Sequence, residues 1–391
     1  MPGVVVPGIH TLLTIAGFAC VGLAACYGVL TTIAVLVWRA RRPAMHPRVM
    51  PPVTLLKPLC GAEPGLYAHL RSFCVQDYSE FQIVFGVRDP ADAALAVVSR
   101  LQAEFPRLPI DVAVNPQLHG SNYKISNLIN MVALARHDVL AIADSDTSVG
   151  ADYLRSVTGP LLERQVGLVT CLYCDVPTAG IWSRLGAMYI NEWYMPSVQL
   201  AWLFGHERYA SGQTLCLRRQ TLESIGGFEA MRDHLADDYR LGELICAQGM
   251  RIVLSPTEVL AEHHEPDFES LTRHELRWMR TIRALRPRSF CLLFLSFTLP
   301  LAGVGLALAA SGHALSPAVW TLFDIALAAR LVPHFAHRAG GIRRRLADLW
   351  LVPVRDGLLG WFWLQSFFGS KVTWRGGEFD VDANGIMHRS P

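Results

Sequence analysis

An apolar run near the start of the chain constrains the fold most strongly. No charged residue occurs between Ile9 and Trp38, and about 20 such residues suffice to cross the hydrocarbon core of a bilayer. A cleaved signal peptide is the alternative, but it would carry basic residues before a shorter apolar core, and neither is present. The run therefore predicts a membrane-spanning helix.

Basic residues directly after this run predict its orientation. The cluster comprises Arg39, Arg41, Arg42 and Arg48, and such clusters mark the cytoplasmic side of a membrane helix. We therefore expect residues 1–48 to form a membrane helix with a basic flank, and the segment that follows to be cytoplasmic.

The composition agrees with a partly membrane-embedded chain. Of the 391 residues, 51% are hydrophobic and 17% are charged, so lipid is expected to surround part of the protein. The formal net charge is only +2, and basic residues do not alternate with aromatic ones along the sequence. Both features argue against nucleic acid as a partner. The nine cysteines are scattered and are expected to be reduced thiols.

Apolar segments recur near the other end of the chain. Segments 290–310 and 314–335 predict a membrane hairpin around a turn at 311–313, with cytoplasmic ends marked by basic flanks: Arg283, Arg286, Arg288, Arg338, Arg343, Arg344 and Arg345. Segment 349–368 contains Arg355 and Asp356. Because charges are costly in hydrocarbon, an interfacial or re-entrant placement is favoured over a full span. Residues 288–391 are thus expected to form a C-terminal membrane region.

The central region, residues 49–287, has a different pattern. Short apolar runs typical of buried strands alternate with helical stretches: strands at 53–58, 81–87, 110–114 and 139–144, and helices at 66–74, 93–105 and 124–135. This alternation predicts an α/β domain with a mostly parallel sheet. In such sheets the ligand binds beyond the carboxyl ends of the strands.

Two carboxylates stand at one of these strand ends. Asp144 and Asp146 are two residues apart, so their side chains return to the same side of the chain. Carboxylates held together repel unless a cation joins them, and oxygen ligands without a Cys/His set suggest Mg²⁺ or Mn²⁺. An Asp-rich turn that caps the next helix is the alternative.

Further polar groups are candidates for the same site. Asp89 and Asp92 follow the 81–87 strand and could accept hydrogen bonds from a ribose or a base, although Asp92 also suits a helix N-cap. Asp237 and Asp238 open an amphipathic helix, where the helix dipole alone could explain one of them. His263 and His264 either complete a metal shell or lie in a solvated loop.

The stretch RHELRWMRTIR, residues 273–283, is a basic helix that leads into the membrane hairpin. By itself it is typical of a juxtamembrane anchor, with Arg for lipid phosphates and Trp278 for the interface. It is not an HExxH zinc helix, because position 278 is Trp.

Six motifs in a fixed order carry a family resemblance: RDPAD, YKISNL, ADSD, RRQTLESIGGF, ADDY and LRW. Together, between membrane segments, they resemble the ceramide glucosyltransferase-like branch of the family 2 glycosyltransferases. Within that branch, LLKPLCGAEPGL, FGVRDPAD, HGSNYKISNLINM and WRGGEF resemble most the bacterial hopanoid-biosynthesis glycosyltransferases. The similarity covers nearly the whole chain.

The resemblance implies a GT-A domain, Rossmann-like, that uses a UDP-sugar and inverts the anomeric centre. Asp89 would lie at the uridine, Asp144 at the metal and diphosphate with Asp146 as supporting ligand, and Asp238 rather than Asp237 would be the general base. Lys124 or Arg277 can stabilise the leaving UDP. Arg277 and Trp278 match the family's Q/R-x-x-R-W signature, but its first position is His274 here. That departure leaves the acceptor or diphosphate contact of position 274 open.

The predicted function is therefore sugar transfer to a membrane lipid. The favoured pair is UDP-N-acetylglucosamine with a hopanoid polyol at the bacterial inner membrane, with the catalytic domain in the cytoplasm. Ceramide glucosylation from UDP-glucose is the alternative. A membrane transporter or receptor with a soluble sensor domain is more remote, because the first span offers almost no polar residues.

Overall fold

The computed structural model describes residues 8–41, 50–206, 208, 210–336, 342–374 and 377–389. The chain folds into two compact units, each assembled from separate stretches. The membrane unit comprises Met1–Ala40, Pro177–Phe204 and His264–Thr373, and the sheet unit comprises Arg41–Val176, Gly205–His263 and Trp374–Pro391. The domain limits at residues 48 and 287 stay predictions.

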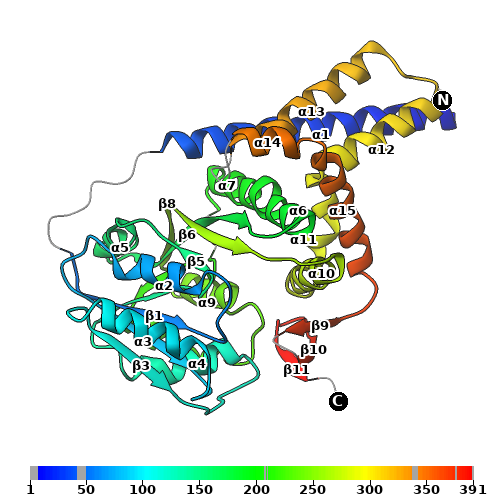
Figure 1. Cartoon of the computed structure of the whole chain (residues 1–391). Coiled ribbons are helices and arrows are strands. Elements are labelled where there is room, and N and C mark those ends of the chain that lie inside the picture. Colours follow the sequence, from blue (N-terminus) through cyan, green and yellow to red (C-terminus); the bar gives the residue numbers. More distant parts are fainter. Residues whose placement is uncertain are drawn as a thin grey trace. The chain divides into compact units, whose positions relative to one another are not determined.

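An eight-stranded sheet forms the centre of the sheet unit, in the order β3-β2-β1-β4-β7-β6-β8-β5 (Figure 1). Its first four strands in this order run parallel, whereas β7 is antiparallel to β4 and β6, and β5 is antiparallel to β8. The strands are β1 (Val53–Pro58), β2 (Phe81–Val87), β3 (Ile110–Val114), β4 (Val139–Ile142), β5 (Thr147–Ser148), β6 (Val166–Pro177), β7 (Leu215–Arg218) and β8 (Arg251–His263). The predicted α/β class with parallel strands is confirmed.

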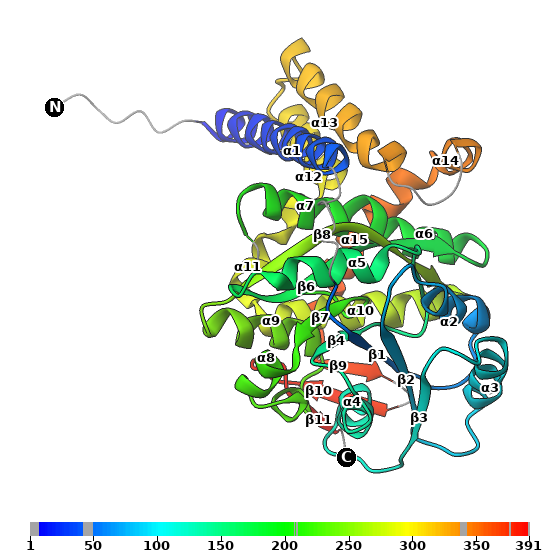
Figure 2. The same cartoon turned by 90° about the vertical axis from the view of Figure 1, so that its left-hand side faces the viewer.

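The helices of the sheet unit lie between these strands in sequence. Near the parallel strands are α2 (Leu66–Cys74), α3 (Ala94–Glu104) and α4 (Tyr123–Val132) (Figure 2). The others are α5 (Tyr153–Thr158), η1 (Gly159–Leu162), α8 (Arg219–Ser224), η3 (Phe228–Met231) and α9 (Asp237–Ala247). The four predicted strands and three predicted helices are confirmed, with ends that shift by up to three residues.

Close packing of α4 on β2 fixes the helix that matters most for the site. Gly86 lies within β2, and a Cβ there would come within 2.3 Å of Met131 Sδ. Asn127 Nδ2 donates to the Gly86 carbonyl at 2.8 Å. Only glycine lets the helix approach this closely, so the packing at Gly86 sets the distance between α4 and the sheet.

In the membrane unit, α1 (Ile9–Ala40) and α13 (Pro317–Ala336) are long and apolar enough to cross a bilayer, among the described residues. Helices α1 and α12 (Thr298–Ser311) cross tightly, because a Cβ on Gly17 would lie 2.7 Å from the Gly305 carbonyl oxygen. Small residues allow such close contact between membrane helices.

The segment at 290–310 contains a bend, and its role as a membrane span stays a prediction. The segment consists of α11 (Pro287–Cys291), η4 (Leu292–Ser296) and α12, and a 73° bend separates the first two from the third. Pro300 explains the break, because in a continuous helix its ring would clash with the carbonyl of Ser296, four residues earlier. The three elements form a third span if the bent pair is counted as one.

The remaining elements of the membrane unit are α6 (Ile181–Tyr189), the π-helix η2 (Ile190–Tyr194), α7 (Met195–Leu203), α10 (Phe268–Leu285), α14 (Ile342–Asp348) and α15 (Leu351–Ser366). The boundary between the two units falls within strand β9 (Lys371–Trp374), between Thr373 and Trp374, and β10 (Gly377–Val381) and β11 (Met387–Arg389) belong to the sheet unit. The re-entrant or interfacial placement of 349–368 stays a prediction. Arg42, Arg48 and Arg338 lie outside the described residues.

Candidate active site

The loop after β4 presents the first two carboxylates. Ala143 is still buried, and the chain then turns through Asp144 and Asp146 into the short strand β5. The Asp146 carbonyl accepts a hydrogen bond from Glu262 N at 3.1 Å, which fastens the loop to β8. The Oδ1 atom of Asp146 is buried and has no hydrogen-bond partner among the described residues. A buried carboxylate oxygen of this kind is suited to a cation.

Helix α4 brings a lysine to these carboxylates. Asn122 caps the helix by accepting from Ile125 N at 3.0 Å, so Lys124 stands in the first turn. Its Nζ atom lies 2.7 Å from Asp144 Oδ1 and 3.6 Å from Asp237 Oδ2. Lys124 therefore joins the carboxylate after β4 to the acidic pair at the start of α9.

The acidic pair at the start of α9 faces a glycine loop. Asp238 Oδ2 accepts from Gly212 N at 2.9 Å, and Asp238 Oδ1 accepts from Tyr239 N at 2.7 Å. A Cβ on Gly212 would lie 3.0 Å from Lys124 Nζ and 3.1 Å from Asp144 Oδ2. The backbone at Gly212 thus borders a space shared by three predicted site residues. We call Lys124, Asp144, Asp146, Asp237 and Asp238 the acidic site.

Burial and like charges set the proton affinities within the acidic site. Burial, and then the neighbouring Asp144 carboxylate, raise the pKa of Asp146 to about 7. Burial and the adjacent Asp237 raise the pKa of Asp238 to about 6. Burial alone would lower the pKa of Lys124, but the carboxylates of Asp144 and Asp237 outweigh it and hold the pKa above its usual value. The site therefore favours added positive charge.

Lys57 is a member of this neighbourhood that the sequence interpretation missed. It is fully buried at the end of β1, and its Nζ atom contacts the Asp144 carbonyl at 2.5 Å and Thr147 Oγ1 at 3.3 Å. The ammonium also lies 3.7 Å from the centre of the Phe73 ring. Burial lowers the pKa of Lys57 to about 7. A lysine inside an otherwise apolar strand was the available signal.

Asp89 and Asp92 lie at the carboxyl end of β2, on the same edge of the sheet as the loop after β4. Asp89 is exposed, and its Oδ1 atom accepts from Ala91 N at 2.8 Å. Asp92 accepts from Gly61 N at 3.0 Å and from Ala94 N at 2.8 Å. Asp92 thus ties the loop after β1 to the loop after β2.

The remaining predicted residues lie in the membrane unit, on α10. Trp278 stacks on Tyr189 with a centroid distance of 5.1 Å, and the His274 ring lies 4.2 Å from Trp278. His274 Nδ1 also contacts Glu265 Oε1 at 2.7 Å, while Arg277 is half-buried one position before Trp278. These three residues form one group, but in a different unit from the acidic site.

The two adjacent histidines do not lie in one solvated loop. His263, at the end of β8, is buried, and its Nδ1 atom lies 2.8 Å from Asp175 Oδ2. His264 Nδ1 contacts Thr178 Oγ1 at 3.0 Å. A role for either histidine in a metal shell stays a prediction.

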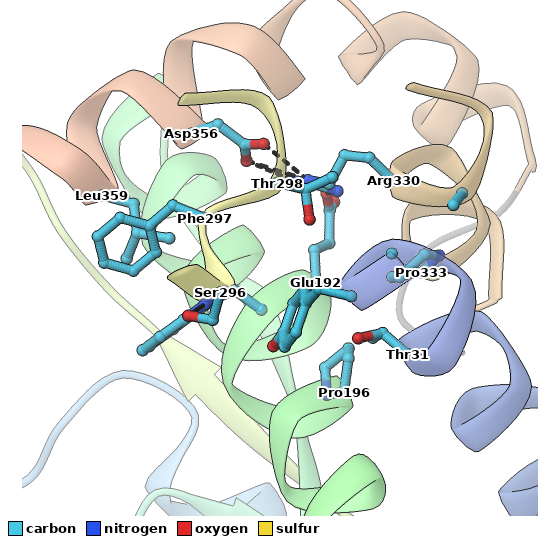
Figure 3. Close-up of a pocket in the computed structure, with 14 residues that line it drawn as sticks. Thr31, Glu192, Pro196, Ser296, Phe297, Thr298, Arg330, Pro333, Asp356 and Leu359 are labelled. Carbon is cyan, nitrogen blue, oxygen red and sulfur yellow. Dashed lines mark hydrogen bonds and ion pairs between the residues drawn. The ribbon is translucent and has the colours of Figure 1, made fainter. Parts of the chain in front are cut away.

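A second group of buried charges lies in the membrane unit; we call Glu192, Arg330, His334 and Asp356 the Arg330 cluster. The Arg330 guanidinium donates to Asp356 at 2.7 to 3.0 Å and to Glu192 Oε2 at 3.0 Å, and Figure 3 shows Glu192 extending toward it. His334 Nδ1 contacts Glu192 Oε1 at 2.7 Å.

The cavity beside the Arg330 cluster is too small to be a substrate site. Its volume is about 20 Å³, and it is lined in part by Thr31, Pro196 and Phe297 (Figure 3). This volume holds a water molecule but no sugar or lipid head group.

The sheet and its acidic strand ends define a GT-A glycosyltransferase fold, carried on a chain with apolar helices. The model of glycosyl transferase family 21 matches residues 18–387, and the chain belongs to this family. The predicted ceramide glucosyltransferase-like resemblance is thereby confirmed.

Known relatives and one solved structure agree with this assignment. Ceramide glucosyltransferase 1 of Caenorhabditis elegans is 22% identical over 73% of this chain and 63% of its own length, and ceramide glucosyltransferase 3 of the same organism is 23% identical over 71% and 61%. The chain thus spans about three fifths of these relatives. A mannosyltransferase from Pyrobaculum calidifontis, solved in complex with GDP-Man and Mn²⁺, has a TM-score of 0.50 and 19% identity over 91% of this chain and 97% of that chain. That likeness shows the fold alone.

Proposed function

We propose that this protein transfers a sugar from a UDP-sugar to a hydroxyl group of a membrane lipid, with inversion at the anomeric carbon. The acidic site carries the proposal: Lys124, Asp144 and Asp238 converge on the side-chain-free backbone of Gly212. The Lys124 ammonium can stabilise a leaving diphosphate, and Asp238 is a candidate general base. Both lie beside the backbone of Gly212, where no side chain fills the space.

The donor would bind along the carboxyl edge of the parallel strands. Asp89 would accept hydrogen bonds from the uridine, and Asp92 would shape the same pocket by holding Gly61 and Ala94. Lys124 would donate to the diphosphate, because its charge already stands beside Asp144 at the strand end.

Asp144 and Asp146 are suited to hold Mg²⁺ or Mn²⁺. Both offer hard carboxylate oxygens, and Asp146 Oδ1 is buried without a hydrogen-bond partner among the described residues. When bound, such an ion would neutralise the negative charge that develops on the diphosphate oxygens as the sugar–phosphate bond breaks.

Asp238 is the proposed general base. Its carboxylate would take the proton of the lipid hydroxyl while the hydroxyl oxygen bonds to the anomeric carbon. The sugar–phosphate bond breaks in the same step, UDP leaves with the bonding electron pair, and Lys124 hydrogen-bonds to it. Burial and Asp237 raise the pKa of Asp238 to about 6, which brings it near the pH at which a base works best.

The acceptor is proposed to be a lipid alcohol that binds at His274, Arg277 and Trp278. The curated relatives are ceramide glucosyltransferases, so they support ceramide and glucose better than they support a hopanoid polyol and N-acetylglucosamine. The hopanoid pair rests on the sequence motifs and is kept as the second candidate.

The basic flanks of the apolar segments support a sheet unit on the cytoplasmic side of the membrane. The choice of a bacterial inner membrane rests on the hopanoid resemblance alone. A reporter fused after Arg286 should therefore be cytoplasmic, since Arg283 and Arg286 precede the bent span. A periplasmic reporter would overturn this topology.

The test is a purified-protein assay that crosses two donors with two acceptors. UDP-glucose and UDP-N-acetylglucosamine are each incubated with ceramide and with a hopanoid polyol in the presence of Mn²⁺, and lipid products are identified by mass. We expect glucosylceramide, loss of transfer in EDTA, and recovery when Mg²⁺ or Mn²⁺ is restored.

Matched variants separate the acidic site from a general effect on folding. Asp144→Asn should lose transfer, whereas Asp152→Asn, an exposed aspartate in the same segment, should keep it. Absence of any glycosylated lipid in all four combinations would refute the proposed function. Full activity in EDTA would refute the metal assignment, and a product from the hopanoid polyol alone would replace ceramide as the acceptor.

A further inference from the structure

The last strands of the chain pair with each other in the sheet unit. Strands β10 and β11 are antiparallel, with Phe379 opposite Arg389 and Val381 opposite Met387. The turn between them is held by Asp382, whose Oδ1 atom accepts from Asn384 N at 2.8 Å and from Ile386 N at 3.0 Å. We call residues 377–389 the C-terminal hairpin.

The C-terminal hairpin is hydrogen-bonded to the loop that leads into α9. Met387 N donates to the Asp233 carbonyl at 2.8 Å, and Leu235 N donates to the Gly385 carbonyl at 3.0 Å. His234 forms an antiparallel bridge with Ile386. We call residues 232–236 the pre-α9 loop; Asp237 and Asp238 follow it directly.

The pre-α9 loop is in turn locked to the loop before α4. Asp233 Oδ1 accepts from Ser121 N at 2.9 Å and from Ser121 Oγ at 3.1 Å. The fully buried Asn122 donates from its backbone N to the Arg232 carbonyl at 2.8 Å. Its Nδ2 atom donates to the His234 carbonyl, also at 2.8 Å. The two loops that deliver Asp238 and Lys124 are therefore joined by several hydrogen bonds.

The junction has no spare room. A Cβ on Gly120 would lie 2.5 Å from the Arg232 carbonyl oxygen, so the loop before α4 and the pre-α9 loop are in backbone contact. On the other side the C-terminal hairpin buries Phe379 and Met387, which are 2% and 4% exposed. The pre-α9 loop is thus held from both sides.

We propose that the C-terminal hairpin is a positioning element of the acidic site, which fixes Asp238 and Lys124 through the pre-α9 loop. This inference rests on the proposed function, because it assigns the hairpin to the same transfer reaction. Misplacing a reacting group by about 1 Å can cost about 100-fold in rate, so a hairpin far from the reacting atoms can control the rate. Asp233 and Met387 are positioning residues in this sense, since neither is expected to touch substrate.

A matched pair of substitutions isolates the contact. Met387→Pro and Met387→Ala both remove the buried side chain, but only proline removes the N–H that donates to Asp233. We expect Met387→Pro to reduce kcat at least tenfold relative to Met387→Ala, with the KM for UDP-sugar changed less than threefold. Equal kcat values for the two folded variants would overturn the inference.

A second pair covers the case in which Met387→Pro does not fold. Asp233→Ala removes the acceptor of both Ser121 bonds, whereas Asp233→Asn keeps an acceptor oxygen. We expect Asp233→Ala to reduce kcat at least tenfold and Asp233→Asn to restore most of the loss. A loss that is the same in both variants, or absent in both, would contradict the proposed role.

Hydrogen exchange tests the inference independently of activity. In Met387→Pro the amides of Asn122 and Gly212 should exchange at least tenfold faster than in Met387→Ala, while those of strand β2 stay unchanged. Unchanged protection at both amides would overturn the inference. If the unsubstituted protein glycosylates no lipid, the proposed function fails, and the exchange data still decide whether the hairpin holds the two loops.

Discussion

The acidic site and the Arg330 cluster are both buried groups of charge, yet they are built on opposite plans. In the Arg330 cluster, Arg330 donates to Asp356 and Glu192, and His334 engages the second oxygen of Glu192. In the acidic site, two ammonium groups among the described residues, those of Lys124 and Lys57, lie near the four carboxylates of Asp144, Asp146, Asp237 and Asp238. The Arg330 cluster thus pairs both of its carboxylates internally, whereas the acidic site carries surplus negative charge.

The difference separates a structural role from a binding role. A buried charge is costly unless it is paired, so a closed network joins its elements and leaves nothing for a ligand. The Arg330 cluster joins η2, α13 and α15 in this way. In the acidic site, burial and a neighbouring carboxylate instead raise the pKa of Asp146 and that of Asp238, so the site favours the arrival of a cation or another positively charged group.

The largest expected effect concerns the base. Asp238→Asn should reduce transfer by about 10² to 10⁴-fold, the usual contribution of a positioned general base, while binding of UDP-sugar and Mn²⁺ persists. The matched control is Asp237→Asn; the Asp237 side chain is 12% exposed and lies 3.6 Å from Lys124. This variant should transfer nearly normally.

The measurement is the initial rate of lipid glycosylation alongside the affinity for UDP. If Asp237→Asn loses transfer and Asp238→Asn keeps it, the two residues exchange roles. If both variants lose UDP binding, the acidic pair contributes to the donor site and not to proton transfer.

The next-largest expected effect concerns the stability that the Arg330 cluster provides. Arg330→Met leaves Glu192 and Asp356 as buried carboxylates without their guanidinium, and breaking a buried pair in this way typically costs about 3–5 kcal/mol of stability. Replacing two residues together, with Arg330→Met and Asp356→Leu, should recover part of that loss, because the apolar side chains need no partner and Glu192 keeps its contact with His334.

Thermal unfolding in detergent, followed by intrinsic fluorescence, measures both changes. UDP and Mn²⁺ affinity should stay the same in every folded variant. A specific loss of UDP-sugar affinity in folded Arg330→Met would contradict the purely structural role of the Arg330 cluster.

The sequence predicted the sheet well because its signals are local. Short apolar runs such as 53–58 and 81–87 became β1 and β2 with the predicted limits, since burial on both faces demands continuous apolar residues. The position of Asp144 at the carboxyl end of β4 was likewise expected from the sheet rule, whereas Asp238 was chosen over Asp237 only through the family resemblance.

Other features depend on contacts between distant residues and could not be read from local patterns. Arg330 pairs with Glu192, which is 138 residues away in the sequence. In a hydropathy profile this arginine only lowers the hydropathy of an apolar segment and does not identify its partner. The role of Lys57 also depends on a distant contact, because only the fold brings its ammonium to the Asp144 carbonyl. The bend at Phe297 lies close to Pro300, a local signal that the prediction of a span over 290–310 did not use.

The pH dependence sharpens the comparison further. Burial and Asp237 raise the pKa of Asp238 to about 6, and the base works only when deprotonated. With UDP-sugar and Mn²⁺ saturating, transfer should therefore fall about tenfold per pH unit below about 6 and level off above it. The rate–pH profile of Asp238→Asn should lack this acid limb, and an identical limb in that variant would assign it to another group.

The smallest expected effect tests whether the aromatic group on α10 serves the acceptor. Trp278 stacks on Tyr189 of α6, and Trp182 of α6 packs on Phe268 of α10 at the same centroid distance of 5.1 Å. The two pairs join the same two helices, so Trp182→Ala is a matched control for Trp278→Ala. An aromatic pair contributes about 0.5–1.5 kcal/mol beyond its buried area, and both variants should lose a similar amount of stability.

Only Trp278→Ala should also change catalysis. If Trp278 contacts the lipid, its removal should raise the KM for the acceptor about 2- to 12-fold, the range that corresponds to about 0.5–1.5 kcal/mol. Trp278→Phe should restore much of the loss, because a ring remains to stack on Tyr189. Equal acceptor KM values in Trp182→Ala and Trp278→Ala would mean that Trp278 only joins α10 to α6. Its role would then be structural, like that of the Arg330 cluster. A change confined to Trp278→Ala would instead place the acceptor on α10, within the unit that carries the membrane helices.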